Sequence, residues 1–241
     1  MDGSLDGKVA LVTGGGRGIG RATARALALR GAHVFVAART AQQIEAVAKE
    51  ITEQGGTATS LQLDVSDEAS VHEAFKTLSE QSGRLDILVN NAGIGLYGEL
   101  KEFSAEDFDR TMAVNLRGTF LCCREALRLM ARQGSGYIIN VSSVVGFKGY
   151  PNQSAYTASK HGVMGLTKSL AVEAQGYGVR VSAILPGGVD TQMATDARPD
   201  LDRSILLQPD DIAQSVLYLL SLSDRAHVDE IYIRRRTSKP F

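Results

Sequence analysis

The chain has 241 residues, of which 44% are hydrophobic and 22% are charged, and its net charge is −1. This composition is that of a globular protein, and the balanced charge gives no reason to expect a nucleic acid or an anionic membrane as a partner. The first ten residues, MDGSLDGKVA, lack the apolar core of a signal peptide. The sequence contains no run of 18 apolar residues, so we expect no transmembrane helix. We therefore expect a cytoplasmic protein.

Strand-like and helical segments alternate along the whole chain. Short apolar runs that end at glycine or polar residues predict strands, and longer segments with helical spacing of apolar residues predict helices. Repeated β-α-β units with nearly continuous apolar strands predict a parallel sheet covered on both faces. No linker divides residues 1–241, so we expect a single doubly wound α/β domain with a seven-stranded parallel sheet. The predicted strands are 8–14, 32–38, 57–65, 85–93, 136–143, 179–188 and 228–234, and the predicted helices are 18–31, 41–56, 68–83, 104–132, 154–176 and 209–222.

The segment TGGGRGIG, residues 13–20, lies between the first predicted strand and the first predicted helix. Its Gly14, Gly18 and Gly20 follow the spacing G-x-x-x-G-x-G. Glycines permit a tight turn and let the backbone approach a pyrophosphate at a helix N-terminus. A flexible turn is the alternative, but the position at the first β-α crossover favours nucleotide binding.

Polar or turn-forming residues end four further predicted strands: Asp64-Val65, Asn90 to Gly93, Ser142-Ser143 and Pro186-Gly187. Each is also ordinary turn chemistry. Ligands of open parallel sheets bind outside the carboxyl ends of the strands. The four ends together therefore predict one shared cleft.

Tyr156 and Lys160 stand four positions apart in SAYTASKHG, residues 154–162, and would meet on one face of a helix. Taken alone, the pair is more typical of a helix surface. Together with the glycine turn and Ser143, the pair is better interpreted as catalytic, because a phenol next to a cation is a candidate general acid and base.

The combination of Thr13-Gly14-x-x-x-Gly18-x-Gly20, Asp64, Asn91-Ala92-Gly93, Asn115, Ser143, Tyr156-x-x-x-Lys160 and Pro186-Gly187 resembles the short-chain dehydrogenase/reductase family in order and spacing over nearly the whole chain. The likeness extends to the 3-oxoacyl-carrier-protein reductases of that family. It implies a Rossmann-like fold and an enzyme that transfers hydride between a nicotinamide and a carbonyl or alcohol. It also implies that Lys160 bonds the nicotinamide ribose and that Asn115 kinks a helix and leads a water to Lys160.

In this chemistry Tyr156 supplies or removes the proton on the substrate oxygen. A lysine charge about 4 Å from a phenolate stabilises it by about 4 kcal/mol at an effective dielectric of about 20. One pKa unit is about 1.36 kcal/mol, so we expect Lys160 to lower the Tyr156 pKa from about 10 towards 7. Ser143, rather than the adjacent Ser142, is expected to bond the substrate oxygen. The predicted catalytic residues are Asn115, Ser143, Tyr156 and Lys160.

NADP(H) is the predicted cofactor, in preference to NAD(H). An acidic residue about 20 positions after the glycine turn would accept the ribose 2′-hydroxyl and select NAD. The chain has Ala37-Ala38-Arg39-Thr40 there, and Arg39 and Arg17 are placed to bind a 2′-phosphate instead. The predicted cofactor-binding residues are Gly14, Gly16, Arg17, Gly18, Ile19, Gly20, Arg39, Asp64, Val65, Asn91, Ala92, Gly93, Tyr156, Lys160, Pro186, Gly187, Val189 and Thr191.

The substrate-binding residues are predicted to be Ser143, Val145, Tyr156 and Met193, and Ile94, Gly95, Phe147 and Tyr150 are further candidates for the pocket wall. Because these residues are mostly apolar, they indicate a substrate that is a small or medium, largely apolar ketone or aldehyde, or a 3-oxoacyl thioester. Plain packing in the core is the alternative role for the apolar residues among them. Residues 186–209 are expected to close over the substrate.

Arg124, Arg128 and Arg132 recur every four residues. They are typical of a solvated or interface face, and a dock for an acyl carrier protein is the alternative. The adjacent Cys122 and Cys123 are expected to be core thiols, and no metal site is predicted. The basic end, residues 234–241, is either disordered or in contact with a neighbouring subunit. We expect a homotetramer or dimer.

Two other functions remain open at this stage. One is an NAD-dependent alcohol dehydrogenase of the same family. The other is a nucleotide-sensing scaffold without redox chemistry, which the presence of both Tyr156 and Lys160 disfavours.

Overall fold

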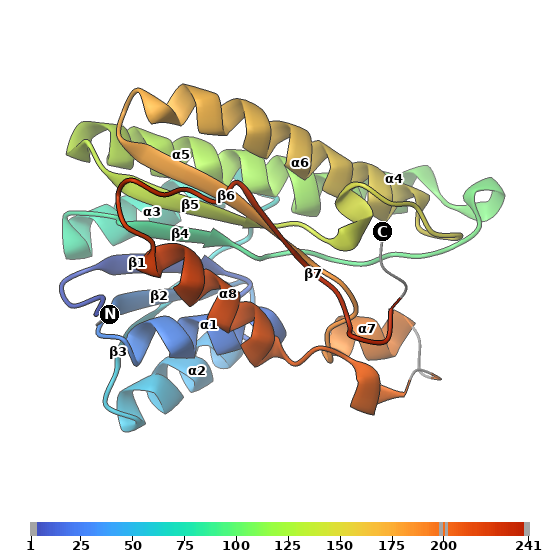
Figure 1. The fold of residues 1–241 in the computed structure, drawn as a ribbon, viewed down its shortest axis with the longest axis horizontal. Helices are drawn as coiled ribbons and strands as arrows, with labels where there is room; N and C mark the ends of the chain where they lie inside the picture. The colour runs from blue at the N-terminus through green and yellow to red at the C-terminus, as the bar shows by residue number, and fades with distance from the viewer. Residues whose placement is uncertain (1–3, 198–199, 201, 239–241) are drawn as a thin grey trace.

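A parallel seven-stranded sheet in the order β3-β2-β1-β4-β5-β6-β7 runs through the middle of the molecule, in a computed structural model that describes residues 4–197, 200 and 202–238 (Figure 1). Each of the seven predicted strands is present, with ends within a few residues of the predicted ones, and the doubly wound α/β domain is confirmed. The strands are β1 (Val9–Thr13), β2 (His33–Ala38), β3 (Thr57–Gln62), β4 (Ile87–Asn90), β5 (Gly136–Val141), β6 (Val179–Pro186) and β7 (Glu230–Ile233).

Helices cover both faces of the sheet, as Figure 1 shows. On one face the apolar side chains of α3, α5 and α6 pack against the strands, and on the other those of α1, α2 and α8 do so. Strands buried from both sides explain the nearly continuous apolar runs in the sequence. The α-helices are α1 (Gly18–Ala28), α2 (Ala41–Glu53), α3 (Glu68–Ser82), α4 (Ala105–Met112), α5 (Gly118–Gln133), α6 (Ser154–Gln175), α7 (Gln192–Ala197) and α8 (Pro209–Ser221).

The predicted helical region 104–132 is two helices joined by a turn of π-helix, Ala113–Arg117. The hydrogen-bonding pattern widens where Asn115 lies, and the helical direction continues into α5. Single π-helical turns inside α-helices often accompany functional sites. The structure thus has a π-helical turn at Asn115, where the family resemblance implies a kink, and the water expected to lead to Lys160 stays a prediction.

The segment 186–209, expected to close over the substrate, contains α7 and a short 3-10 turn at Arg203–Ile205. Val189 and Leu207 form an isolated parallel bridge that closes the base of this segment. Residues 198, 199 and 201 lie outside the described part of the chain. The described residues of this segment are therefore tied to the end of β6.

The sheet register brings the predicted cleft together. Val12 pairs with Val89, Asn90 with Asn140, and Val141 with Ile184, so the residues that follow these strands share one edge. No helix in the described part of the chain is long and apolar enough to cross a bilayer.

Candidate active site

The glycine turn after β1 has a backbone that only glycines permit. Gly14 and Gly18 adopt the left-handed region, with φ of 62° and 52°, which favours glycine. A Cβ on Gly20 would overlap the carbonyl oxygen of Gly14. The turn therefore leaves its backbone bare at the N-terminus of α1, where an anion binds well.

Side chains after β4 and at the end of β1 hold this turn in place. The Asn91 amide Nδ2 donates to the carbonyl oxygens of Thr13 and Gly14, at 3.0 and 3.2 Å. In return, the Thr13 hydroxyl accepts hydrogen bonds from the backbone N–H groups of Asn91 and Ala92, both at 3.0 Å. Asn91 therefore acts on the shape of the glycine turn, and Thr13 is a positioning residue that the sequence did not single out for a role.

Arg17 and Arg39 are both exposed. Neither side chain hydrogen-bonds or ion-pairs with any residue in the described ranges. Arg39 follows the end of β2, and Arg17 is the residue before α1. Two unengaged guanidinium groups beside the turn fit a further negative group on a nucleotide.

Ser143 lies beside Tyr156, close enough to affect the pKa of its phenol. Ser143 begins the short 3-10 turn after β5, accepts a hydrogen bond from the Val145 N–H at 3.3 Å and donates to the Pro186 carbonyl at 3.4 Å. Ser142 is buried and donates to the Lys160 carbonyl, at 3.2 Å. Of the two serines, it is thus Ser143 that meets the phenol.

Lys160 is 5% exposed, and its ammonium donates to the carbonyl oxygen of Val141 at 3.0 Å. Its Nζ lies 5.8 Å from the centre of the Tyr156 ring. Burial lowers the pKa of Lys160 to about 8, because the charged form loses its water. The lysine is thus held close to the phenol and is shielded from solvent.

The expected lowering of the Tyr156 pKa is not what the structure shows. Burial raises the pKa of Tyr156 above its ordinary value, the neighbouring Tyr97 adds to the rise, and the nearby Ser143 hydroxyl opposes it. Desolvation of the buried phenol dominates its pKa, and Lys160 directs its ammonium to the Val141 carbonyl. In the protein alone, Tyr156 is a protonated phenol at neutral pH.

Asn115 is fully buried, and its amide holds the loop after β4 at two points. Its Oδ1 accepts from the Ile94 N–H at 2.8 Å, and its Nδ2 donates to the Ile94 carbonyl at 2.9 Å and to the Ser159 hydroxyl at 3.1 Å. A Cβ on Gly93 would lie 3.3 Å from Asn115 Oδ1 and 3.8 Å from Lys160 Nζ. The four predicted catalytic residues therefore converge on one place, with Ser159 as a positioning residue that the sequence analysis missed.

The remaining predicted cofactor residues lie along the same edge of the sheet. The Asp64 carboxylate accepts from the Ser66 N–H and hydroxyl, at 2.9 and 2.6 Å, and so closes the turn after β3. Thr191 lies against the glycine turn, since a Cβ on Gly18 would come within 3.2 Å of its methyl group. The Gly187 N–H donates to Ile233 at 2.7 Å, which fixes the end of β6. Gly16 adjoins Gln43, while Ile19, Val65 and Val189 pack into the interior.

The predicted substrate residues are not all equally placed. Val145 is buried, Phe147 and Tyr150 are exposed, and Met193 lies half-buried on α7. Phe147 meets Tyr232, with ring centroids 5.1 Å apart. The aromatic ring that contacts Tyr156 belongs to Tyr97, which the sequence analysis did not consider.

The arginine row on α5 is largely neutralised. Arg124 bonds Glu68 at 2.8 Å and Glu125 at 3.1 Å, and Arg128 bonds Glu125 at 2.8 Å. Of the basic end, residues 234–238 are described and fold back on themselves, with the Arg234 guanidinium donating to the Ser238 carbonyl at 2.7 Å. Residues 239–241 lie outside the described part.

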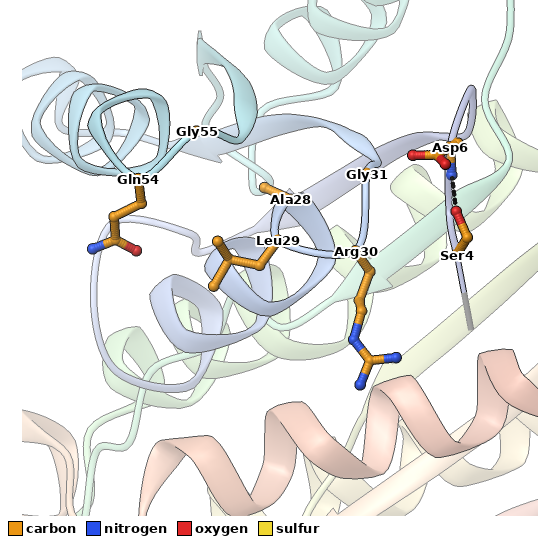
Figure 2. Close-up of a pocket in the computed structure, with 8 residues that line it drawn as sticks. All are labelled: Ser4, Asp6, Ala28, Leu29, Arg30, Gly31, Gln54 and Gly55. Carbon is orange, nitrogen blue, oxygen red and sulfur yellow. Dashed lines mark hydrogen bonds between the residues drawn. The ribbon is translucent and has the colours of Figure 1, made fainter. Parts of the chain in front are cut away.

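Two cavities lie away from this site. One, of about 500 Å³, is shown in Figure 2 between the N-terminal segment, the end of α1 and the turn after α2. Its Gly31 and Gly55 precede β2 and β3, so it opens at the amino edge of the sheet, opposite the glycine turn. The other, of about 530 Å³, lies on the outer side of α4, α5 and α6, with Met112, Leu116, Phe120 and Leu166 in its wall.

Comparison with known proteins agrees with this geometry. The sequence model of the short chain dehydrogenase family matches residues 8–202. A levodione reductase from Leifsonia aquatica is 43% identical over 81% of this chain and 74% of its own length. A 3-oxoacyl-[acyl-carrier-protein] reductase from Synechocystis sp. is 40% identical over 93% of this chain and 94% of its own length. A metagenomic short-chain oxidoreductase crystallised with NADP superposes with a TM-score of 0.86 at 36% identity, covering 97% of this chain and 99% of that one.

Proposed function

Because the chain belongs to the short-chain dehydrogenase family, we propose that it is an NADP(H)-dependent oxidoreductase that reversibly reduces a small or medium, largely apolar ketone or aldehyde. The observation that carries the proposal is the convergence of Ser143, Tyr156 and Lys160 beside the glycine turn. A 3-oxoacyl thioester is a second substrate class, favoured by the reductase of Synechocystis sp..

The site fits a dinucleotide. Gly20 has no room for a Cβ, and the bare backbone before α1 is the cradle a pyrophosphate needs. Gly93 lies next to Lys160, and a Cβ there would come within 3.3 Å of Asn115 Oδ1, a tight contact. When bound there, a nicotinamide would supply hydride to the carbonyl carbon, or would accept it in the reverse reaction.

The chain's own residues handle the proton. Ser143 orients the substrate oxygen, and Tyr156, protonated at neutral pH because burial raises its pKa, donates its proton to that oxygen during reduction. Lys160 stabilises the phenolate that remains. Asn115 positions the loop that carries Gly93 and Ile94. In the oxidative direction the phenolate accepts the proton, so oxidation should be favoured at high pH.

A panel of ketones and aldehydes tests the proposal through the loss of NADPH absorbance. We expect reduction of apolar carbonyl compounds that requires Tyr156. If nucleotide binds and no carbonyl compound is reduced, the non-catalytic scaffold becomes the better explanation.

We propose NADP(H) over NAD(H) on the basis of Arg39 and Arg17, which are exposed beside the turn and have no carboxylate partner among the described residues. The metagenomic relative crystallised with NADP supports a nicotinamide cofactor. An NAD-dependent alcohol dehydrogenase remains the alternative, and the ratio of kcat/KM for NADPH and NADH decides between the two.

The same proposal includes a homotetramer in the cytoplasm. The outer cavity has an apolar wall that includes Met112, Leu116, Phe120 and Leu166, and Phe120 is 45% exposed. Exposed apolar patches mark contact surfaces. A second copy of the chain fits this face. Light scattering at micromolar concentration should report a mass above the 25.7 kDa of one chain. An acyl carrier protein on α5 is less favoured, because Glu68 and Glu125 already pair with Arg124 and Arg128.

A further inference from the structure

Tyr97 is a second phenol in the candidate active site. It belongs to the segment between β4 and α4, and its ring meets that of Tyr156 edge to face, with centroids 5.6 Å apart and planes at 70°. This geometry is favourable for two aromatic rings. The contact places Tyr97 beside the group proposed to donate the proton.

The hydroxyl of Tyr97 lies over the backbone of Gly95. A Cβ on Gly95 would overlap the Tyr97 hydroxyl, so the ring depends on the glycine for its position. The φ of Gly95 lies outside the left-handed region, so the backbone itself would accept another residue there. The missing side chain thus serves the phenol rather than the turn.

This hydroxyl has hydrogen-bonding capacity that the protein does not use. Tyr97 is half-buried, and its hydroxyl forms no hydrogen bond with any residue in the described part of the chain. Burial raises the pKa of Tyr97, so the phenol keeps its proton at neutral pH and remains a donor. The hydroxyl is not sealed from solvent, so it is free to take a hydrogen-bond partner from outside the chain.

We propose that Tyr97 is a specificity-determining residue whose hydroxyl donates a hydrogen bond to a second oxygen of the substrate, near the reacting carbonyl. The inference rests on the proposed carbonyl reduction and narrows its substrate class to hydroxyketones and diketones. The reacting oxygen itself is taken by the Ser143–Tyr156 pair, to which Tyr97 makes no hydrogen bond. Tyr97 therefore reaches a different atom of the same molecule.

Matched ketones test this inference in the complete enzyme with saturating NADPH. Suitable pairs are acetophenone with 2-hydroxyacetophenone and 2-butanone with 3-hydroxy-2-butanone. In Tyr97→Phe, which keeps the ring, kcat/KM for the hydroxyketone should fall roughly three- to ten-fold, the range that a neutral hydrogen bond contributes. The plain ketone should change by less than roughly two-fold, and the loss should lie mainly in KM, because the hydrogen bond forms away from the reacting oxygen.

Gly95→Ala provides the second variant, because it displaces the phenol and leaves Tyr97 in the sequence. It should reduce the preference for the hydroxyketone as Tyr97→Phe does, and the double variant should lose no more than either single one. Tyr177→Phe is the matched control, since Tyr177 is 52% exposed just after the far end of α6.

An unchanged ratio of the two kcat/KM values in Tyr97→Phe, or an equal loss for both ketones, overturns the inference while leaving carbonyl reduction intact. If the unmodified enzyme binds NADPH and reduces no ketone of any pair, the proposed function fails and the inference falls with it.

Discussion

The glycine turn after β1 and the Tyr156 cluster after β5 lie on the same edge of the sheet, but different parts of the chain build them. In the turn the backbone is the proposed binding surface, and the side chains of Thr13 and Asn91 hold it in place. In the cluster the side chains of Tyr156 and Lys160 are the proposed catalytic groups, and burial has changed their pKa values. Substitutions in the turn should therefore lower nucleotide affinity, whereas substitutions in the cluster should lower kcat.

Tyr156→Phe should have the largest effect. It removes the proton donor and keeps the ring, so kcat for ketone reduction should fall by about 10²- to 10⁴-fold, the usual contribution of general acid catalysis. NADPH affinity, measured by fluorescence titration, should stay within roughly two-fold. A near-normal kcat would show that the phenol is not the acid and would remove the contrast between the two regions.

Lys160 should make the free energy of unfolding depend on pH. Burial lowers its pKa from 10.5 to about 8, so between these values the unfolded chain binds more protons than the folded one and stability rises with pH. Between pH 7.5 and 9.5 the rise should be about 2 kcal/mol, from roughly 1.5 pKa units at about 1.36 kcal/mol each.

Urea unfolding of the nucleotide-free protein measures this rise. Lys160→Met should lack it, because the methionine does not titrate. Equal slopes for the two proteins over this pH range would show that Lys160 keeps its ordinary pKa in the fold.

Arg39→Leu should weaken the binding of NADPH by roughly ten- to a hundred-fold, since a hydrogen bond to a charged group contributes about 1.5–3 kcal/mol. NADH binding should change little, because it has no 2′-phosphate. The double change Ala38→Asp with Arg39→Leu should reverse the preference. Equal kcat/KM for the two nucleotides in the unmodified protein would contradict the NADP(H) assignment.

Gly20→Ala should lower nucleotide affinity by roughly five- to a hundred-fold, because its Cβ meets the Gly14 carbonyl and overpacking costs about 1–3 kcal/mol. Gly176→Ala is the matched control, since no atom lies within 4 Å of a Cβ there. Calorimetric titration of both variants with NADPH compares them. Wild-type affinity in Gly20→Ala would mean that the bare backbone is not the nucleotide cradle.

Most of the fold could be predicted from the sequence, because the strands are short apolar runs and the helices have regular apolar spacing. The glycine turn could also be predicted from the sequence. Gly14 and Gly18 have positive φ angles, and Gly20 has no room for a Cβ. Ser143, Tyr156 and Lys160 were found through their spacing and the family resemblance. Ser143 follows β5, whereas Tyr156 and Lys160 lie on α6, so their convergence depends on the contacts between α6 and the end of β5.

What the sequence did not predict depends on contacts between distant segments. The π-helical turn forms where Asn115 bonds Ile94, 21 residues earlier. Tyr97 becomes part of the site only because its ring meets Tyr156 from another loop. The direction in which the Tyr156 pKa shifts depends on desolvation of the phenol. The spacing of residues along one helix does not indicate how far the phenol is desolvated.

The π-helical turn Ala113–Arg117 also bears on how this part of the chain tolerates changes in length over evolution. A π turn amounts to one extra residue in an α-helix, and each residue advances the helix by about 100°. Deleting one residue here would give a straight helix with Asn115 rotated away from Ile94. Surface loops absorb insertions and deletions easily, whereas the stretch from Ala105 to Gln133 should accept many substitutions but hardly any change in its number of residues.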